Sequence, residues 1–416
     1  MSSLILPRLL LETPVVVTGY GAVSAGGLSV DDLWHRVEQG ASPAVARAFD
    51  FGAAPRRMAV CVVPELEGND PALRPVRRMD RSVQLAWLAA QQALRSAGLD
   101  CGHAGLSMGI ITGSSRGPLG KIADGFERLH QRRYPPSLSA DCTFAALSGA
   151  LAQSLKVTGP SATISATCAS GAYAIAFAAE QILLGKADIF LVGAAEAPLV
   201  PAVLAQLDAA GVLGSHPEAA QTCRPFDRTR NGLCLGEGSG FLVLESAEAA
   251  SRRAVTPVAR LSGWGLCVDD SGRTGVDEWG SGVTDAATQA LHAAGLEPAA
   301  IDYVNTHGTG TIANDLAEAR ALRRIFGSRV DSLPCTSTKP ITGHCLGATP
   351  ALEAVVCIEA LRRGLIPPTA NCHQPDPECA INMQPGDAQP AELRHVMSNS
   401  LGFWGYHASL IFSKAP

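Results

Sequence analysis

A cysteine at the junction of two expected elements is the first candidate for chemistry. Cys168 lies in the run Ile164 to Gly171, where a β-rich stretch stops and an apolar run up to Gly185, long enough for a buried helix, begins. A thiol at that point is near unpaired backbone N–H groups and the positive end of a helix dipole, both of which favour the thiolate. Cys168 is therefore a candidate nucleophile, and a buried structural thiol is the alternative.

Two further segments carry histidines in turns rich in glycine and threonine. His307 lies in Val304 to Thr311, and His344 lies in Ser337 to Ala348, with Lys339 five residues before it. Each turn follows an apolar run that we expect to form a strand. A lone histidine after a strand is more often structural, but two in such turns favour a catalytic role.

Together with Cys168, the two histidines resemble the Cys-His-His arrangement of β-ketoacyl-acyl carrier protein synthases, in the synthase II and type II polyketide synthase branch. The resemblance covers nearly the whole chain, and its order and spacing are specific. Its other motifs are Val15 to Ser24, Cys223 to Asp227, Leu235 to Gly240, Ile366 to Asn371, Pro375 to Cys379 and Asn399 to Phe403.

Composition excludes several other classes. The 416 residues can bury a large core, and 47% hydrophobic with 17% charged residues is ordinary for a soluble α/β enzyme. A formal charge of −5 argues against a nucleic-acid-binding protein. The 12 cysteines include no Cys-x-x-Cys pair, which argues against a zinc site or a disulfide framework. The apolar run Leu4 to Leu11 is too short to span a membrane, and we expect a strand or a packed extension there. These features predict a cytoplasmic protein.

Short β-branched runs alternate with alanine- and leucine-rich stretches, which is typical of a layered α/β fold. Two halves, 1–256 and 257–416, follow the same logic, because the helix expected after His344 echoes the helix after Cys168. The resemblance implies a thiolase-like five-layer αβαβα fold of two pseudo-duplicated halves. The sequence also predicts further elements: strands at 15–19, 108–113, 188–193 and 257–262, helices at 84–97, 169–184 and 347–365, and a surface loop at 268–281.

The resemblance also implies roles in a decarboxylating condensation. Cys168 would carry the acyl group, and its backbone N–H with that of Phe403 would form the oxyanion hole. His307 and His344 would donate N–H bonds to the malonyl thioester oxygen. Lys339 would support the hydrogen-bond network, with Glu353 as its partner, since an unpaired carboxylate in an apolar helix is costly.

Further residues are assigned by the same resemblance. Thr309 and Thr311 would bind the phosphopantetheine arm of an acyl carrier protein, so no cofactor of the chain's own is expected. A homodimer or a heterodimer with a chain-length-factor-like subunit is expected. The remaining candidates are a carrier-docking cluster, Arg74, Arg77 and Arg78, and a site for a monovalent cation, Asn305, Glu353, Ser398 and Asn399, which structural hydrogen bonds explain equally well.

Two positions depart from the family pattern. Trp404 replaces a glycine in Gly402 to His407, which limits the motion of the gate loop that carries Phe403. Arg116 stands near the distal end of the acyl pocket, where a small or aliphatic residue is usual, and a buried guanidinium needs a partner across a dimer interface or on the substrate. Both favour a polyene- or polyketide-type acyl substrate over housekeeping fatty-acid elongation.

The residues argue against three other functions. A non-catalytic chain-length factor would lack the cysteine, and a thiolase would carry a second cysteine near the C-terminus, where Ser400 to Gly405 has none. A cysteine hydrolase would need a His/Asn or His/Asp pair directed at Cys168, and local spacing supplies none.

Overall fold

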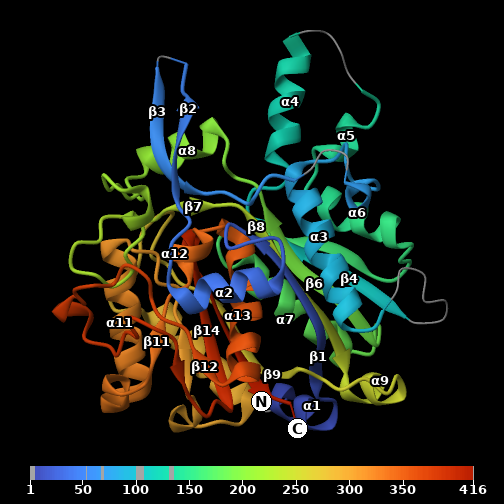
Figure 1. The fold of residues 1–416 in the computed structure, drawn as a ribbon. Coiled ribbons are helices and arrows are strands. Elements are labelled where there is room, and N and C mark those ends of the chain that lie inside the picture. The colour runs from blue at the N-terminus through green and yellow to red at the C-terminus, as the bar shows by residue number, and fades with distance from the viewer. Residues whose placement is uncertain (1–4, 53, 67–69, 100–106, 131–134, 416) are drawn as a thin grey trace.

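The computed structural model describes residues 5–52, 54–66, 70–99, 107–130 and 135–415. Figure 1 shows the strands of one large sheet packed among helices. One half of that sheet comes from the first part of the chain. Its strands run in the order β1 (Val15–Ser24), β8 (Gly238–Ser246), β6 (Ile189–Glu196), β4 (Met108–Gly113) and β5 (Ser161–Ile164).

The other half repeats this pattern with strands from the later part of the chain. β9 and β15, and β15 and β14, pair antiparallel, whereas β14 and β10, and β10 and β11, pair parallel, as their counterparts do in the first half. These strands are β9 (Ala259–Val268), β15 (Tyr406–Lys414), β14 (His395–Gly402), β10 (Tyr303–Asn305) and β11 (Cys335–Thr336).

Helices complete the layers. α7 (Ser170–Leu183) and α13 (Thr349–Arg363) pack between the two half-sheets, α3 (Arg81–Ser96) covers the outer face of the first, and α10 (Ser281–Ala294) covers that of the second, with α11 (Ile312–Phe326) beside it. The half-sheets join only where β1 meets β9 over Val15 to Val17. This arrangement confirms the thiolase-like αβαβα fold, and we propose that its halves divide between residues 256 and 257.

The position of α7 and α13 between the two half-sheets explains their residue types. α7 carries alanine on most of its buried face and α13 is buried through Leu361, because a helix between two sheets has no solvent face. A side chain at Gly240 would lie 2.6 Å from the backbone of Ala351, so glycine lets β8 approach α13. Close packing of this layer fixes the ends of the two helices, and these ends hold the site described below.

Most expected elements are confirmed within a few residues, including the helix at 84–97, which starts at Arg81 under an Asp80 cap, and the loop after β9. Of the two forms expected at Leu4 to Leu11, the strand is wrong, because the chain forms helix α1 (Ile5–Glu12) there, which packs on the body through the buried Leu10. Leu4 lies outside the described residues. A short apolar run without alternation does not distinguish the two structures.

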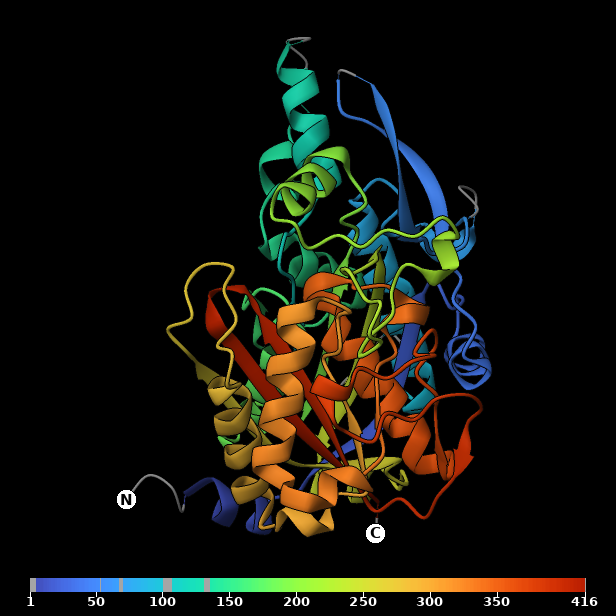
Figure 2. The same ribbon diagram turned by 90° about the vertical axis from the view of Figure 1, so that its left-hand side faces the viewer.

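Two segments rise from the body on the same side in both views (Figure 1, Figure 2). They are the hairpin of β2 (Val45–Asp50) and β3 (Pro55–Cys61), which pairs with β7 (Leu235–Gly236), and helix α4 (Leu119–His130). Among the described residues, no helix is long and apolar enough to cross a membrane. The remaining elements are α2 (Val30–Gln39), α5 (Leu138–Asp141), α6 (Ala145–Leu155), α8 (Pro201–Ala209), α9 (Ala247–Arg252), α12 (Lys339–Thr342), β12 (Leu365–Ile366) and β13 (Gln389–Pro390).

Candidate active site

Cys168 lies in a tight turn between β5 and α7, just before the helix cap at Ala169. The preceding residue, Thr167, adopts a left-handed φ of 49°, which is uncommon for a residue with a side chain. Ser170 fixes the turn by donating its hydroxyl to the Thr167 carbonyl (2.6 Å) and accepting from the Ala166 N–H (2.9 Å). Strained turns of this kind occur at functional sites, where they aim one side chain.

Burial raises the pKa of the Cys168 thiol to about 11, although the charges of Arg116 and Lys339 and the Phe403 backbone N–H oppose this shift. The sequence predicted the opposite balance, with the thiolate favoured at a helix start. The thiol is only 8% exposed and packs among apolar side chains such as Leu207 and Leu346. Desolvation of the thiolate therefore outweighs the neighbouring charges and dipoles.

The Phe403 segment is held directly against the nucleophile turn. Thr167 Oγ1 donates to the Phe403 carbonyl (3.1 Å), and the Phe403 N–H faces the Cys168 sulfur. A side chain at Gly402 would lie 2.1 Å from Thr167 Oγ1, so only glycine fits there. Two backbone N–H groups, of Cys168 and Phe403, are thus available beside the sulfur, as an oxyanion hole requires.

The two histidines meet although they lie on different turns. The His307 and His344 ring centroids are 5.3 Å apart at an interplanar angle of 84°. His307 follows β10, as expected, whereas His344 follows the one-turn helix α12 rather than a strand. His344 Nδ1 lies 3.0 Å from Thr349 Oγ1. When that hydroxyl donates to Nδ1, the proton of the neutral ring sits on Nε2.

Both imidazoles are kept neutral. Burial, followed by the nearby Lys339 ammonium, holds the pKa of His307 and that of His344 well below the usual value. A neutral imidazole donates one N–H without needing acid, which suits stabilisation of a developing oxyanion.

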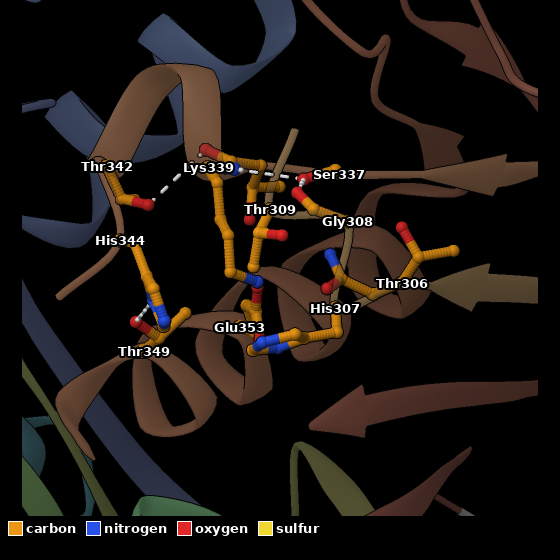
Figure 3. A network of polar contacts seen from close by, with 12 residues as sticks. Thr306, His307, Gly308, Thr309, Ser337, Lys339, Thr342, His344, Thr349 and Glu353 are labelled. Atoms are coloured by element: carbon orange, nitrogen blue, oxygen red, sulfur yellow. Dashed lines mark hydrogen bonds and ion pairs between the residues drawn. The ribbon is translucent and has the colours of Figure 1, made fainter. Parts of the chain in front are cut away.

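Lys339 and Glu353 form a buried ion pair beneath these rings. Lys339 Nζ lies 2.6 Å from Glu353 Oε1, and the two side chains are 0% and 1% exposed. In Figure 3 the Lys339 side chain extends from α12 to Glu353, with His344 and His307 on either side. Burial raises the pKa of Glu353 to about 7 against the opposing effect of Lys339. The predicted partnership of these two residues is thus present in the structure.

Three of the four residues expected to hold a cation lie on the paired strands β10 and β14, and the fourth, Glu353, lies on α13, which packs against β14. Asn305 pairs with Ser398 in the β10–β14 ladder, and Asn399 Oδ1 accepts from Ser409 (2.8 Å). Asn305 Oδ1 and Glu353 Oε2 are buried without a hydrogen-bond partner among the described residues. Asn399 Nδ2, an N–H donor that cannot bind a cation, is also buried without a partner there. The described residues contain no group of three or more His, Cys, Asp or Glu side chains able to hold a metal.

Glu318 is a site residue that the sequence analysis missed. Its carboxylate accepts the backbone N–H groups of His307 (2.8 Å) and Gly308 (2.9 Å), and it is fully buried on α11. Burial raises its pKa to about 7. Glu318 therefore fixes the backbone of the first histidine turn.

Cys168, His307 and His344 line one cavity of about 550 Å³. Thr309 and Thr311 line it with their hydroxyl oxygens 2.9 Å apart, and α11 begins beside them. The predicted residues that reach this cavity are Cys168, His307, His344, Thr309, Thr311, Phe403, Arg116 and Trp404. The exposed cluster Arg74, Arg77 and Arg78 lies elsewhere, beside the start of α3.

Arg116 finds a partner within its own chain. Its side chain is half-buried, and Nη1 donates to Gln206 Oε1 at 3.1 Å. The expectation that its partner lies across an interface or on the substrate is therefore incomplete, since a neutral amide of α8 supplies one acceptor. The backbone N–H of Arg116 donates to Glu196 Oε1 (3.2 Å).

Trp404 forms part of the rim of the cavity. It is 55% exposed, has a left-handed φ of 65°, and carries the Arg273 guanidinium 5.6 Å above its ring. The backbone N–H of Trp404 donates to the Arg273 carbonyl (3.0 Å). These contacts join the gate loop to the loop after β9, in line with restricted motion.

A second missed feature is a histidine–aspartate pair in the same cavity wall. His407 Nε2 lies 2.7 Å from Asp269 Oδ2, and His407 lines the cavity. The sequence analysis found no such pair, which would have favoured a cysteine hydrolase. No hydrogen bond joins His407 to Cys168 in the described structure, and its Nε2 is occupied by the aspartate, so the pair does not form a hydrolase triad.

Two protein-family models match the chain. The model described as beta-ketoacyl synthase, N-terminal domain, matches residues 12–250, and the corresponding C-terminal domain matches residues 258–373.

Curated relatives match over nearly their whole length. Nodulation protein E of Rhizobium sp. (strain N33) is 35% identical, over 97% of this chain and 99% of that protein. A putative polyketide beta-ketoacyl synthase 1 of Streptomyces halstedii is 34% identical, over 96% and 97%. The 3-oxoacyl-[acyl-carrier-protein] synthase 2 of Coxiella burnetii (strain RSA 493 / Nine Mile phase I) is 33% identical, over 96% and 98%.

Solved structures agree in fold. The ishigamide ketosynthase/chain length factor aligns with a TM-score of 0.88 and 32% identity, over 97% of this chain and 100% of that chain. A type II polyketide acyl carrier protein in complex with its ketosynthase, bound to the hexaketide, aligns with a TM-score of 0.85 and 26% identity, over 97% and 100%.

Proposed function

Because the chain belongs to the beta-ketoacyl synthase family, we propose that it condenses an acyl group held on Cys168 with a malonyl unit carried by an acyl carrier protein. The product is a β-ketoacyl thioester on the carrier, and carbon dioxide leaves. The main observation in support of these residue roles is that Cys168, His307 and His344 line one cavity, with the two histidine ring centroids 5.3 Å apart.

The first half-reaction is a thioester exchange. The Cys168 sulfur attacks the acyl carbonyl of the incoming thioester, and the pantetheine sulfur leaves with the proton that Cys168 gives up. The carbonyl oxygen gains charge in the tetrahedral intermediate, which the N–H groups of Cys168 and Phe403 stabilise. A thiol with a pKa of about 11 is largely protonated at neutral pH, so the proton moves during the attack.

The second half-reaction breaks the bond between the malonyl carboxylate and its α-carbon. The electron pair moves onto the thioester carbonyl, and the N–H groups of His307 and His344 stabilise the resulting enolate oxygen. The enolate carbon then attacks the acyl-cysteine, and the thiolate of Cys168 leaves. The chemistry needs no cofactor of the chain's own, because the carrier's pantetheine arm presents the substrate, with Thr309 and Thr311 as its hydrogen-bond partners.

Intact-protein mass spectrometry tests the nucleophile. Incubation with an acyl-carrier protein should add one acyl mass to the wild type and none to Cys168→Ala, which should remain folded. A stoichiometric adduct on Cys168→Ala would overturn the assignment. Cys142→Ala, at a half-buried cysteine outside the cavity, is the matched control and should acylate normally.

We propose a specialised pathway of the polyene or polyketide type, with fatty-acid elongation as the alternative. Arg116 supports the first, since a guanidinium is a poor neighbour for a saturated chain, and Trp404 supports it by offering an aromatic face at the rim of the cavity. Relatives named as polyketide synthase and nodulation protein E agree with it, while a relative named 3-oxoacyl-[acyl-carrier-protein] synthase 2 agrees with the alternative. Competition between saturated and conjugated acyl-carrier proteins of similar length separates them, and preferential condensation of the saturated chain would favour elongation.

The proposed partners are an acyl carrier protein and a second subunit, either another copy or a chain-length-factor-like chain. Solved relatives are described with each kind of partner. Arg74, Arg77 and Arg78 suit an acidic carrier, because they are exposed on a chain of net negative charge. Reversing all three charges should weaken carrier binding without slowing acylation from a short pantetheine thioester.

A monovalent cation among Asn305, Glu353, Ser398 and Asn399 remains part of this proposal. Two partnerless buried oxygens support it. The ion would stabilise the second histidine turn through Glu353 and Lys339. Unfolding in potassium, sodium and tetramethylammonium salts tests it, since a bulky cation cannot enter so closed a site.

A further inference from the structure

We propose that Arg116 makes the acyl pocket selective for chains that carry a mid-chain carbonyl oxygen, and that Glu196 and Gln206 position it. The inference rests on the proposed function and narrows its substrate class, because it favours an oxygenated acyl group over a hydrocarbon chain, conjugated or saturated.

Charge in the cavity is the first observation. Among the described residues that line it, Arg116 is the only Lys, Arg, Asp or Glu. A guanidinium has five N–H donors, and Arg116 donates just one side-chain hydrogen bond within the described chain, to Gln206 Oε1. Gln206 is neutral, so it satisfies one donor without cancelling the charge. The guanidinium is half-buried at the cavity wall and keeps N–H donors free for a ligand.

The carboxylate nearest to Arg116 is committed to the backbone. Glu196 Oε1 accepts the N–H groups of Ser115 and Arg116 and the hydroxyl of Ser114 (3.2 Å). Glu196 is fully buried, and its second oxygen, Oε2, has no hydrogen-bond partner among the described residues, so the carboxylate makes no hydrogen bond with the Arg116 guanidinium. It thus fixes the turn from which Arg116 projects and leaves the guanidinium available to a ligand.

The position of Arg116 relative to the nucleophile is the third observation. Arg116 and Cys168 line the same cavity, and the Arg116 charge lowers the pKa of the Cys168 thiol. Around them, Leu207, Val212 and Leu346 supply apolar walls. A chain on Cys168 would meet apolar surface with one set of donors along its path.

This pattern discriminates between chains. A ketone oxygen can accept from the free guanidinium N–H groups, whereas a hydrocarbon chain strips water from them and gives nothing back. Donors that a bound chain covers and leaves unpaired are the means by which a site rejects an analogue that lacks the matching group. A conjugated chain could at best stack on the guanidinium face.

Acylation kinetics of Cys168 test the inference without a carrier protein. The probes are pantetheine thioesters of octanoate, of a mid-chain oxo-octanoate series and of an octadienoate, with adducts followed by intact mass. For the wild type, we expect the best oxo probe to acylate about tenfold faster than octanoate, the factor that corresponds to ~1.4 kcal/mol. In Arg116→Ile that ratio should fall to about one, and Arg116→Lys should keep part of it.

Controls separate the possible failures. Arg252→Gln, a surface arginine paired with Glu248, should keep the wild-type ratio. Arg116→Gln serves if Arg116→Ile fails to fold by circular dichroism. Equal rates for octanoate and every oxo probe, or a preference for octadienoate, would overturn this inference while leaving the proposed condensation intact. Acylation by none of the probes, in wild type, would count against both.

Discussion

The buried pair Lys339–Glu353 offers a quantitative test of how the site is built. Replacing one partner leaves the other in an interior where both are at most 1% exposed. Breaking such a pair typically costs about 3–5 kcal/mol, whereas replacing both partners with apolar residues is often neutral or stabilising. We therefore expect Lys339→Met and Glu353→Leu to be strongly destabilised, and the double variant to recover most of the loss.

The chain length converts this cost to a temperature shift. With an unfolding entropy of about 2.1 cal/mol/K per residue, the single variants should melt about 3–6 °C below the wild type. Differential scanning calorimetry at one fixed protein concentration measures it, since oligomerisation would change the melting temperature. A double variant that melts lower than either single variant would refute the pairing argument.

The same double variant tests the electrostatic role of Lys339. The ammonium lowers the pKa of His307 and of His344. Without the ammonium, the pKa values of both histidines rise. The rings therefore become protonated at a higher pH than in the wild type, and a protonated ring cannot act as a neutral donor. The acid limb of malonyl decarboxylation should therefore move to higher pH. An unchanged limb, or one moved to lower pH, would show that Lys339 does not set the charge of the rings.

Three other outcomes follow from the structure. Arg116→Ile should slow alkylation of Cys168 by iodoacetamide at about pH 8, because loss of the cation raises the pKa of the thiol further; an unchanged rate would contradict this. Burial raises the pKa of Glu196 from 4.5 to about 8, so its stabilising contribution is present below the lower value and lost as pH rises through the upper one. Glu196→Gln should consequently gain melting temperature relative to wild type as pH increases across that window, and a constant difference would argue against a raised pKa. Trp404→Gly should speed the same alkylation of Cys168, since it frees a left-handed position and opens the rim; slower modification would mean that Trp404 does not restrict entry.

The residues found from the sequence share one property. Cys168, His307 and His344 each stand in a local motif, so their chemistry can be recognised without knowing what lies opposite. Lys339 and Glu353 were paired because an apolar helix forces a buried carboxylate to have a partner. The duplicated α/β architecture could likewise be inferred, since the alternation of strands and helices is a local pattern.

The features that the sequence analysis missed depend on contacts between residues far apart in the chain, which no local pattern encodes. Asp269 and His407 are 138 positions apart, and the backbone of Arg116 bonds to a carboxylate 80 positions away. The raised pKa of Cys168 has the same origin, because the helix start is visible in the sequence whereas the depth of burial is not. A strand was one of two forms expected where α1 stands, because a run of eight residues is too short for its hydrophobic spacing to separate a strand from a helix.

Carbon dioxide release from malonyl-carrier protein tests the central claim most directly. If His307 and His344 both stabilise the enolate oxygen, then His307→Ala and His344→Ala should each lose a hundredfold or more of decarboxylation, about 3 kcal/mol of transition-state stabilisation. Acylation of Cys168, followed by intact mass in the same samples, should survive better than decarboxylation. Decarboxylation at the wild-type rate by either variant would remove that histidine from the mechanism and contradict the account.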